Sequence, residues 1–101
     1  MALLYIWEFS EIQVAGGGVP IAHAPGILQQ TPLAISASSV QSLAFNAATR
    51  FIRLNTDTVC SIAISTNPTA VAQGSARMSA NQTEYYGVNG GDKVAVIATT
   101  P

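Results

Sequence analysis

The feature that most constrains this chain is an alternation of apolar and polar residues in short runs. In TRFIRLNTDTVCSIAIS, residues 49–65, Ile52 and Leu54 share one side of an extended chain, and Cys60 and Ile62 share one side of a second run. A period of two residues is typical of β-strands. The polar stretch NTDT between the runs has turn chemistry, so the pattern predicts two strands joined as a hairpin.

The N-terminal run, residues 2–9, also predicts a strand, but one with apolar residues on both faces. Such a strand must be covered on both sides, by the domain on one side and by a neighbouring molecule on the other. Aromatic residues share the first face and aliphatic residues the second: Tyr5, Trp7 and Phe9, then Leu4 and Ile6.

Further strands are predicted near residues 32–37 and 40–46, with a turn between them. The closing segment, RMSANQTEYYGVNGGDKVAVIATT, predicts a last hairpin, because Asn89-Gly90 is a strong turn signal. A helix over residues 69–80 is disfavoured, since Gly74 interrupts it and no large apolar stripe supports it.

These runs predict an all-β fold, a small antiparallel β-sandwich (jelly-roll-like) or barrel of about seven or eight strands. The chain is a single domain overall, divided into an N-terminal strand and Gly/Pro-rich arm, residues 1–30, and the sandwich, residues 31–101. The triple glycine at 16–18 and Pro20 and Pro25 indicate a long loop or flexible arm over residues 15–30.

Charge is scarce throughout the chain. Charged residues make up 9% of the sequence and the net charge is −1, and residues 12–49 contain no Asp, Glu, Lys or Arg. Ordinary soluble domains carry about 25% charged residues. A surface this neutral is typical of a chain packed against neighbours, so we expect a homo-oligomer or a larger assembly. The balance of charge favours neither nucleic acid nor an anionic membrane as a partner.

The residues that carry chemistry do not form a recognisable set. His23 is the only histidine and Cys60 the only cysteine, so neither has a partner at metal-ligand spacing. No nucleophile motif is present, and Asp57 and Asp92 fall in predicted turns. We therefore expect no enzymatic activity, metal, cofactor or small-molecule substrate. Cys60 is expected to be a buried structural thiol.

Arg50, Phe51 and Arg53 interleave cations with an aromatic ring, as single-strand nucleic-acid binders do, but two arginines cannot form a basic groove. Our interpretation is that these arginines pair with Glu84 or Asp57 on the surface.

Tyr85 and Tyr86 are adjacent on a predicted strand, so they point to opposite faces. Glu84 and Tyr86 share one face, which is a candidate contact surface because tyrosine is frequent in interfaces. Cross-strand packing inside the domain explains the same residues equally well. The full set of candidate interface residues is Tyr5, Trp7, Phe9, Val19, Ile21, His23, Glu84 and Tyr86.

Two segments resemble a known class of protein. They are SSVQSLAFNAATRFIRLNTDTVCSIAISTNPTA and RMSANQTEYYGVNGGDKVAVIATT, within residues 38–100. The chain there resembles small all-β structural proteins encoded among the virion genes of tailed bacteriophages, which share segments of the types SVQS-AF, CSIA-GTNPTA and QTEYFGV…KVAVI.

The resemblance implies a decoration or cement protein that binds and stabilises the head lattice through the major capsid protein or other virion proteins. The chain would be made in the bacterial host cytoplasm and end in the virion. MALLYIWEF at the N-terminus lacks the basic residues of a signal peptide. The Gly-rich loop and the apolar N-terminal strand are candidates for an arm that reaches a neighbour.

Two alternatives remain. One is a tail, neck or tail-tip structural component. The other is a carbohydrate- or receptor-binding β-sandwich on the virion, which would use Trp7, Tyr85 or Tyr86 as a stacking platform.

Overall fold

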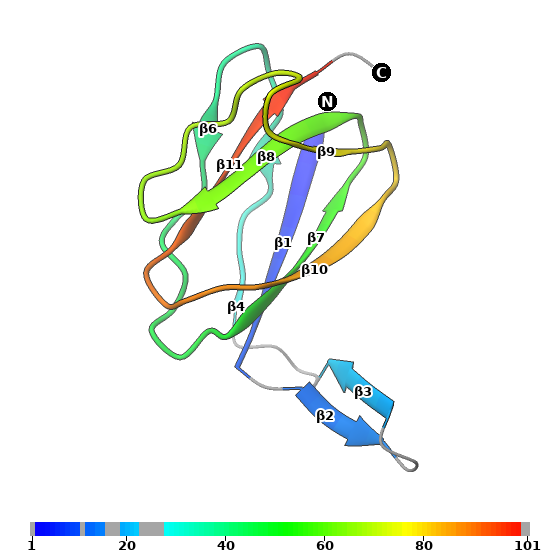
Figure 1. The fold of residues 1–101 in the computed structure, drawn as a ribbon, viewed down its shortest axis with the longest axis vertical. Coiled ribbons are helices and arrows are strands. Elements are labelled where there is room, and N and C mark those ends of the chain that lie inside the picture. The colour runs from blue at the N-terminus through cyan, green and yellow to red at the C-terminus, as the bar shows by residue number, and fades with distance from the viewer. Residues whose placement is uncertain (1, 11, 16–18, 23–27, 100–101) are drawn as a thin grey trace.

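The computed structural model describes residues 2–10, 12–15, 19–22 and 28–99, and the side chains of residues 2–10 and 29–99. Strands but no helix occur in these ranges, which confirms the predicted all-β class (Figure 1). The strands are β1 (Leu3–Phe9), β2 (Ile12–Ala15), β3 (Val19–Ala22), β4 (Leu28–Gln29), β5 (Leu33–Ala34), β6 (Val40–Gln41), β7 (Phe51–Thr56), β8 (Cys60–Ser65), β9 (Ala76–Met78), β10 (Thr83–Gly87) and β11 (Lys93–Ala98).

Two antiparallel sheets form the body of the molecule. The first, called here the β1 sheet, has the order β10-β7-β1-β4, and β5 pairs with the same edge of β1 as β4. The second, called the β8 sheet, has the order β6-β11-β8-β9. Because β4 and β5 share one edge, each sheet is four strands wide. The predicted small antiparallel β-sandwich is therefore confirmed.

Five connections carry the chain from one large sheet to the other. The chain crosses between β5 and β6, between β6 and β7, between β7 and β8, between β9 and β10, and between β10 and β11. Neighbours within a sheet are consequently distant in sequence, which is the pattern of a jelly roll built from Greek keys.

The predicted hairpin of residues 49–65 is wrong, although both of its strands exist. β7 pairs with β1 and β10, whereas β8 pairs with β11 and β9. The NTDT segment forms a corner between the sheets, where Asp57 Oδ1 accepts a hydrogen bond of 2.8 Å from the Leu3 N–H. Thr56 Oγ1 donates to the Thr58 carbonyl at 2.6 Å. Turn residues reverse the chain without specifying which strand it meets next.

The closing hairpin is wrong for the same reason, because β10 and β11 belong to opposite sheets. The Asp92 N–H donates to the Asn89 carbonyl at 3.1 Å, and the positive φ of 89° falls on Gly91 rather than on Asn89 or Gly90. Gly90 is instead a point of close approach, since an added Cβ would lie 2.6 Å from the Ala47 carbonyl oxygen. The turn signal therefore marks a corner that packs on the loop before β7.

The alternation predicted for β1, β7, β8 and β10 is correct, and it defines much of the core. Leu4 and Ile6 of β1 face inward and are essentially fully buried, as are Ile52 and Leu54 of β7. The other sheet contributes the inner sides of β8 and β11, including Cys60, which is buried as expected. The core consists of Leu4, Ile6, Ile35, Phe45, Ile52, Leu54, Cys60, Ile62, Met78, Val88, Val94 and Val96.

The N-terminal strand is part of this sandwich. β1 lies between β7 on one side and β4 and β5 on the other, so in the single chain it is an interior strand of the sheet. The predicted division into an arm, residues 1–30, and a sandwich, residues 31–101, therefore places β1 in the arm, although β1 is an interior strand of the β1 sheet.

The long loop predicted over residues 15–30 is wrong in its described parts. β2 and β3 form an antiparallel ladder from Ile12↔Ala22 to Ala15↔Val19, and β4 follows. Figure 1 shows this hairpin projecting from one end of the sandwich. The molecule measures 42 × 25 × 22 Å along its principal axes. A two-stranded ladder leaves one edge of each strand free, where a proline such as Pro20 is tolerated.

Truncating core side chains in the β8 sheet should destabilise the protein. Ile62 and Val96 are 2% and 0% exposed. We expect Ile62→Ala and Val96→Ala each to lower the free energy of unfolding by about 2–4 kcal/mol, through lost burial and the cavity left behind. Urea denaturation measures this. Val71→Ala, at a position 56% exposed, is the control and should change stability little.

Candidate functional site

The outer face of the β1 sheet is the open face of the sandwich. Strand register places Trp7, Arg53 and Tyr85 in one row across β1, β7 and β10, and Tyr5, Asn55 and Thr83 in the next. Gln29 of β4 continues the first row beyond Trp7. We call this surface the outer face; its members are Tyr5, Trp7, Phe9, Gln29, Phe51, Arg53, Asn55, Thr83 and Tyr85.

The corresponding face of the β8 sheet is covered by the chain itself. Gln41 Nε2 donates to Asn67 Oδ1 at 2.9 Å and to the Pro68 carbonyl at 2.7 Å, which holds these two residues against β6. Ser61 and Ala95, which alternate with core residues on β8 and β11, are 0% exposed. The outer face of the β1 sheet, by contrast, leaves Tyr5 and Tyr85 exposed.

An aromatic cluster occupies part of the outer face. The rings of Phe9 and Phe51 stack with centroids 4.9 Å apart, Trp7 lies 4.8 Å from Phe9, and Tyr85 lies 6.3 Å from Phe51. Such ring contacts are worth about 0.5–1.5 kcal/mol beyond the area they bury. Phe9 is 1% exposed, so this candidate interface residue packs within the chain. Tyr5 and Tyr85 remain 40% and 54% exposed.

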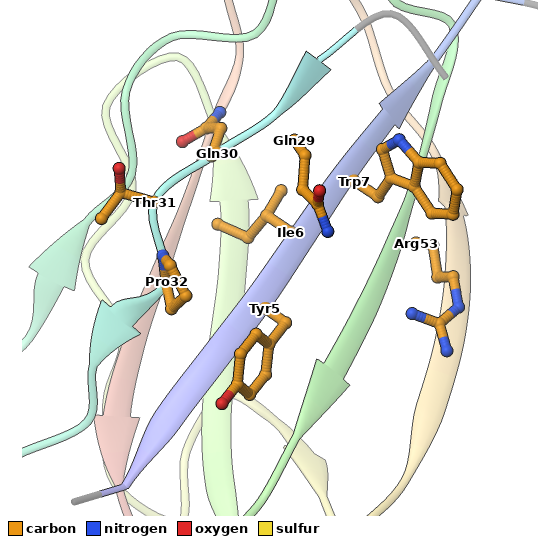
Figure 2. A pocket seen from close by; sticks show the side chains of 8 residues that line it. All are labelled: Tyr5, Ile6, Trp7, Gln29, Gln30, Thr31, Pro32 and Arg53. Atoms are coloured by element: carbon orange, nitrogen blue, oxygen red, sulfur yellow. The ribbon is translucent and has the colours of Figure 1, made fainter. Parts of the chain in front are cut away.

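A hollow lies beside this cluster, where strand pairing along the edge of β1 is interrupted. β4 pairs with Trp7 and Glu8 and β5 with Leu3 and Leu4, and the chain between β4 and β5 leaves a hollow of about 320 Å³. In Figure 2 the Gln29 side chain extends between Tyr5 and Trp7, and Gln30 turns to the opposite side. Arg53 lies next to Trp7, and its guanidinium extends away from the indole ring. The lining residues are Tyr5, Ile6, Trp7, Gln29, Gln30, Thr31, Pro32 and Arg53.

Arg53 has no acidic partner among the described residues, so the interpretation that Arg50 and Arg53 pair with Glu84 or Asp57 is wrong. Asp57 caps the Leu3 N–H, and Glu84 accepts from Gln82 Nε2 at 3.1 Å. Arg50 donates instead to the carbonyls of residues 47 and 49. The reason is the side of the sheet: Glu84 pairs with Leu54 on the inner side, whereas Arg53 points outward.

The inner side of the same strands holds a buried carboxylate. Glu8 is 0% exposed, and its Oε1 accepts hydrogen bonds of 2.7 Å from both the Asn46 N–H and Thr49 Oγ1. Its Oε2 accepts from Gln30 Nε2 at 2.8 Å. Gln30 is itself fixed, because its Oε1 and Nε2 bond the N–H and carbonyl of Leu43 at 3.2 Å. This network explains why the Gln30 side chain points away from the hollow. It also fixes the position of Gln30 in the lining.

Glu84 and Tyr86 do not lie on the outer face. Both are half-buried on the inner side of β10, and Tyr86 packs against the core. Burial, followed by the negative charge of Glu84 and the nearby Cys60, raises the pKa of the Tyr86 hydroxyl. The alternation was correct, but the tyrosine that faces outward is Tyr85.

The structure does not describe the side chains of the three remaining candidate interface residues. Val19 and Ile21 belong to β3, whose side chains are not described, and His23 lies outside the described residues. Arg53, Gln29 and Tyr85 were not among the candidate interface residues. Strand alternation placed Arg53 opposite the core, but only the pairing of β1 with β7 brings it beside Trp7.

No group of side chains in the described part of the chain is arranged to hold a metal ion. Nor does the described chain contain a helix long and apolar enough to cross a membrane. Comparison with known proteins finds no match to any family model, curated protein or solved structure.

The Glu8 network predicts a specific loss of stability in Glu8→Gln. The new amide would replace one carboxylate oxygen with an N–H₂ group. That group would face a hydrogen-bond donor, either Gln30 Nε2 or the pair formed by the Asn46 N–H and Thr49 Oγ1. We expect the free energy of unfolding to fall by about 1–3 kcal/mol, the cost of an unsatisfied buried group. Urea denaturation tests this against Glu84→Gln, whose carboxylate accepts a side-chain bond only from Gln82 among the described residues. A Glu8→Gln protein as stable as the control would contradict the role of the network.

Cys60 should make stability depend on alkaline pH. Burial raises the pKa of its thiol above the ordinary value of 9.0; the hydrogen bond to Thr56 opposes this shift and the charge of Asp57 adds to it. As pH rises above 9.0, the unfolded chain therefore loses the proton first, and the free energy of unfolding falls. Urea denaturation across this range should show a shallower decline for Cys60→Ala. Some decline should persist, because the pKa of Tyr86 is raised as well.

Proposed function

We propose that this chain is a non-enzymatic structural protein of a tailed-bacteriophage virion, a head decoration protein that attaches to the major capsid protein. The resemblance of residues 38–100 to such proteins suggests this role. The observation that carries it is the projecting β2–β3 hairpin, because an isolated two-stranded hairpin is marginally stable in water and needs a surface to pack on.

The hairpin is suited to attachment by its position and composition. It is inserted between β1 and β4, which pair side by side at Glu8↔Leu28, so the sandwich holds both of its ends. It contains no charged residue, and each of its strands has an unpaired edge. Free strand edges bind an additional strand through backbone hydrogen bonds. The partner would add a strand to this ladder and bury its apolar residues.

The scarcity of charge supports a role in a large assembly in general. Charged residues are 9% of the chain, and residues 12–49 have none, so the protein gains little solubility from its surface when free. A tail, neck or tail-tip component would meet the same requirement. Head and tail placement are therefore distinguished by the experiment below.

Replacing residues 11–26 with a short Gly-Ser turn should abolish incorporation while preserving the fold. β1 and β4 are already antiparallel neighbours, so a tight turn can join them. We expect an unchanged urea transition but loss of the protein from purified virions, measured by quantitative mass spectrometry of separated heads and tails. Val71→Ala should incorporate at the parental ratio to the major capsid protein.

The parental protein must be present in the head fraction at a fixed ratio to the major capsid protein. Recovery in tails alone would replace the head assignment with the tail alternative. Full incorporation of the hairpin-replacement variant would show that another surface attaches the protein.

A further inference from the structure

We propose that the hollow on the outer face binds a sugar that carries a carboxylate, such as a uronic acid or a sialic acid. This inference does not depend on the virion role, because every lining residue belongs to the sandwich itself. The hollow is about 320 Å³, near the lower end of the range for small-ligand sites, about 300–1,000 Å³.

Two flat rings give the hollow its apolar surface. Tyr5 and Trp7 are two residues apart on β1, so their side chains leave the same face of the sheet. Trp7 is held by Phe9 at 4.8 Å, and Tyr5 is 40% exposed. A sugar ring has C–H groups on its faces and hydroxyls around its edge, so it can stack on an aromatic ring while its hydroxyls meet polar groups beside that ring.

Arg53 supplies the charge. It is the only charged residue of the outer face, and no described carboxylate or carbonyl occupies its guanidinium. A guanidinium binds a carboxylate through two parallel hydrogen bonds, a geometry that lysine cannot reproduce. The carboxylates nearest in sequence or register, Glu8 and Glu84, lie on the inner side and accept bonds there. An anionic group from outside would therefore meet no local competitor.

The polar rim is suited to hydroxyl groups. The Gln29 amide has no hydrogen-bond partner among the described residues, and Figure 2 shows it extending between Tyr5 and Trp7. Thr31 adds a hydroxyl on the opposite side. The neighbouring Gln30 side chain is fixed by Glu8 and Leu43, so this part of the lining is already ordered, which lowers the entropic cost of binding.

Other occupants use fewer of these groups. A carboxylate on a peptide side chain would engage Arg53 but leave the two rings and the Gln29 amide without a matching partner. A second hollow, of about 430 Å³ beside Tyr86, contains Arg50 and Asp92. Both are already engaged, Arg50 with backbone carbonyls and Asp92 with the Asn89 N–H at 3.2 Å. Of these two hollows in the described part of the chain, only the one on the outer face has an unengaged cation beside aromatic rings.

Titration of the ¹⁵N-labelled full chain with glucuronic acid, N-acetylneuraminic acid, glucose and N-acetylglutamate tests the proposal. We expect at least one of the two sugar acids to bind in the millimolar range and to shift the amide signals of residues 5–7 and 29–31. Arg53→Gln should weaken this binding about tenfold or more, the range expected for a lost charge-assisted pair. Arg77→Gln, at an exposed arginine of β9, should have no effect.

Aromatic variants separate stacking from charge. Tyr5→Ala should weaken binding, whereas Tyr85→Ala, which changes an exposed tyrosine outside the hollow, should not. Thermal unfolding confirms that each variant is folded. Failure of both acids to bind, equal binding of glucose, or equal binding of N-acetylglutamate would each overturn the proposal, the last two by removing the need for the carboxylate or for the sugar.

Discussion

The buried Glu8 carboxylate organises the part of the structure on which the site depends. A charge with no exposed surface is tolerated only when hydrogen bonds replace its hydration, and Glu8 has three, from Gln30, Asn46 and Thr49. Those donors come from the chain after β4 and from the loop before β7. The carboxylate therefore ties β1 to the segment after β4 and to the loop before β7. This fixes the backbone beside the gap between β4 and β5 along the edge of β1.

Burial on the two faces of β1 follows from this arrangement. Leu4, Ile6 and Glu8 point inward, so the residues between them must point outward. Phe9 is covered by its stacking on Phe51, while Tyr5 has no such partner and stays exposed. The open aromatic surface is thus a consequence of a strand in the interior of a sheet whose outer side no described segment covers.

Alternation in the sequence was enough to predict seven of the strands and the sandwich, but it did not reveal β2, β3, β4 and β9. It could not predict pairing, because the same polar corner suits a hairpin or a crossing between sheets, and both predicted hairpins were wrong. The candidate site could not be predicted without the strand pairing, because Arg53 is next to Trp7 only through the pairing of β7 with β1. Side assignment failed at β10 as well, where two adjacent tyrosines gave no sequence signal for which would face the core.

The hairpin and the hollow lie at different places in the fold, and that separation makes their roles compatible. The hairpin projects from one end of the long axis, whereas the hollow lies between β4 and β5 on a sheet face. A sandwich attached through its hairpin would keep that face toward solvent. Outward residues Ser61 and Ala95 of the β8 sheet are fully buried, whereas Tyr5 and Tyr85 on the outer face of the β1 sheet stay exposed. An uncovered aromatic face beside an unpaired arginine is costly in solubility unless it contacts something, which is the physical reason to seek its ligand there.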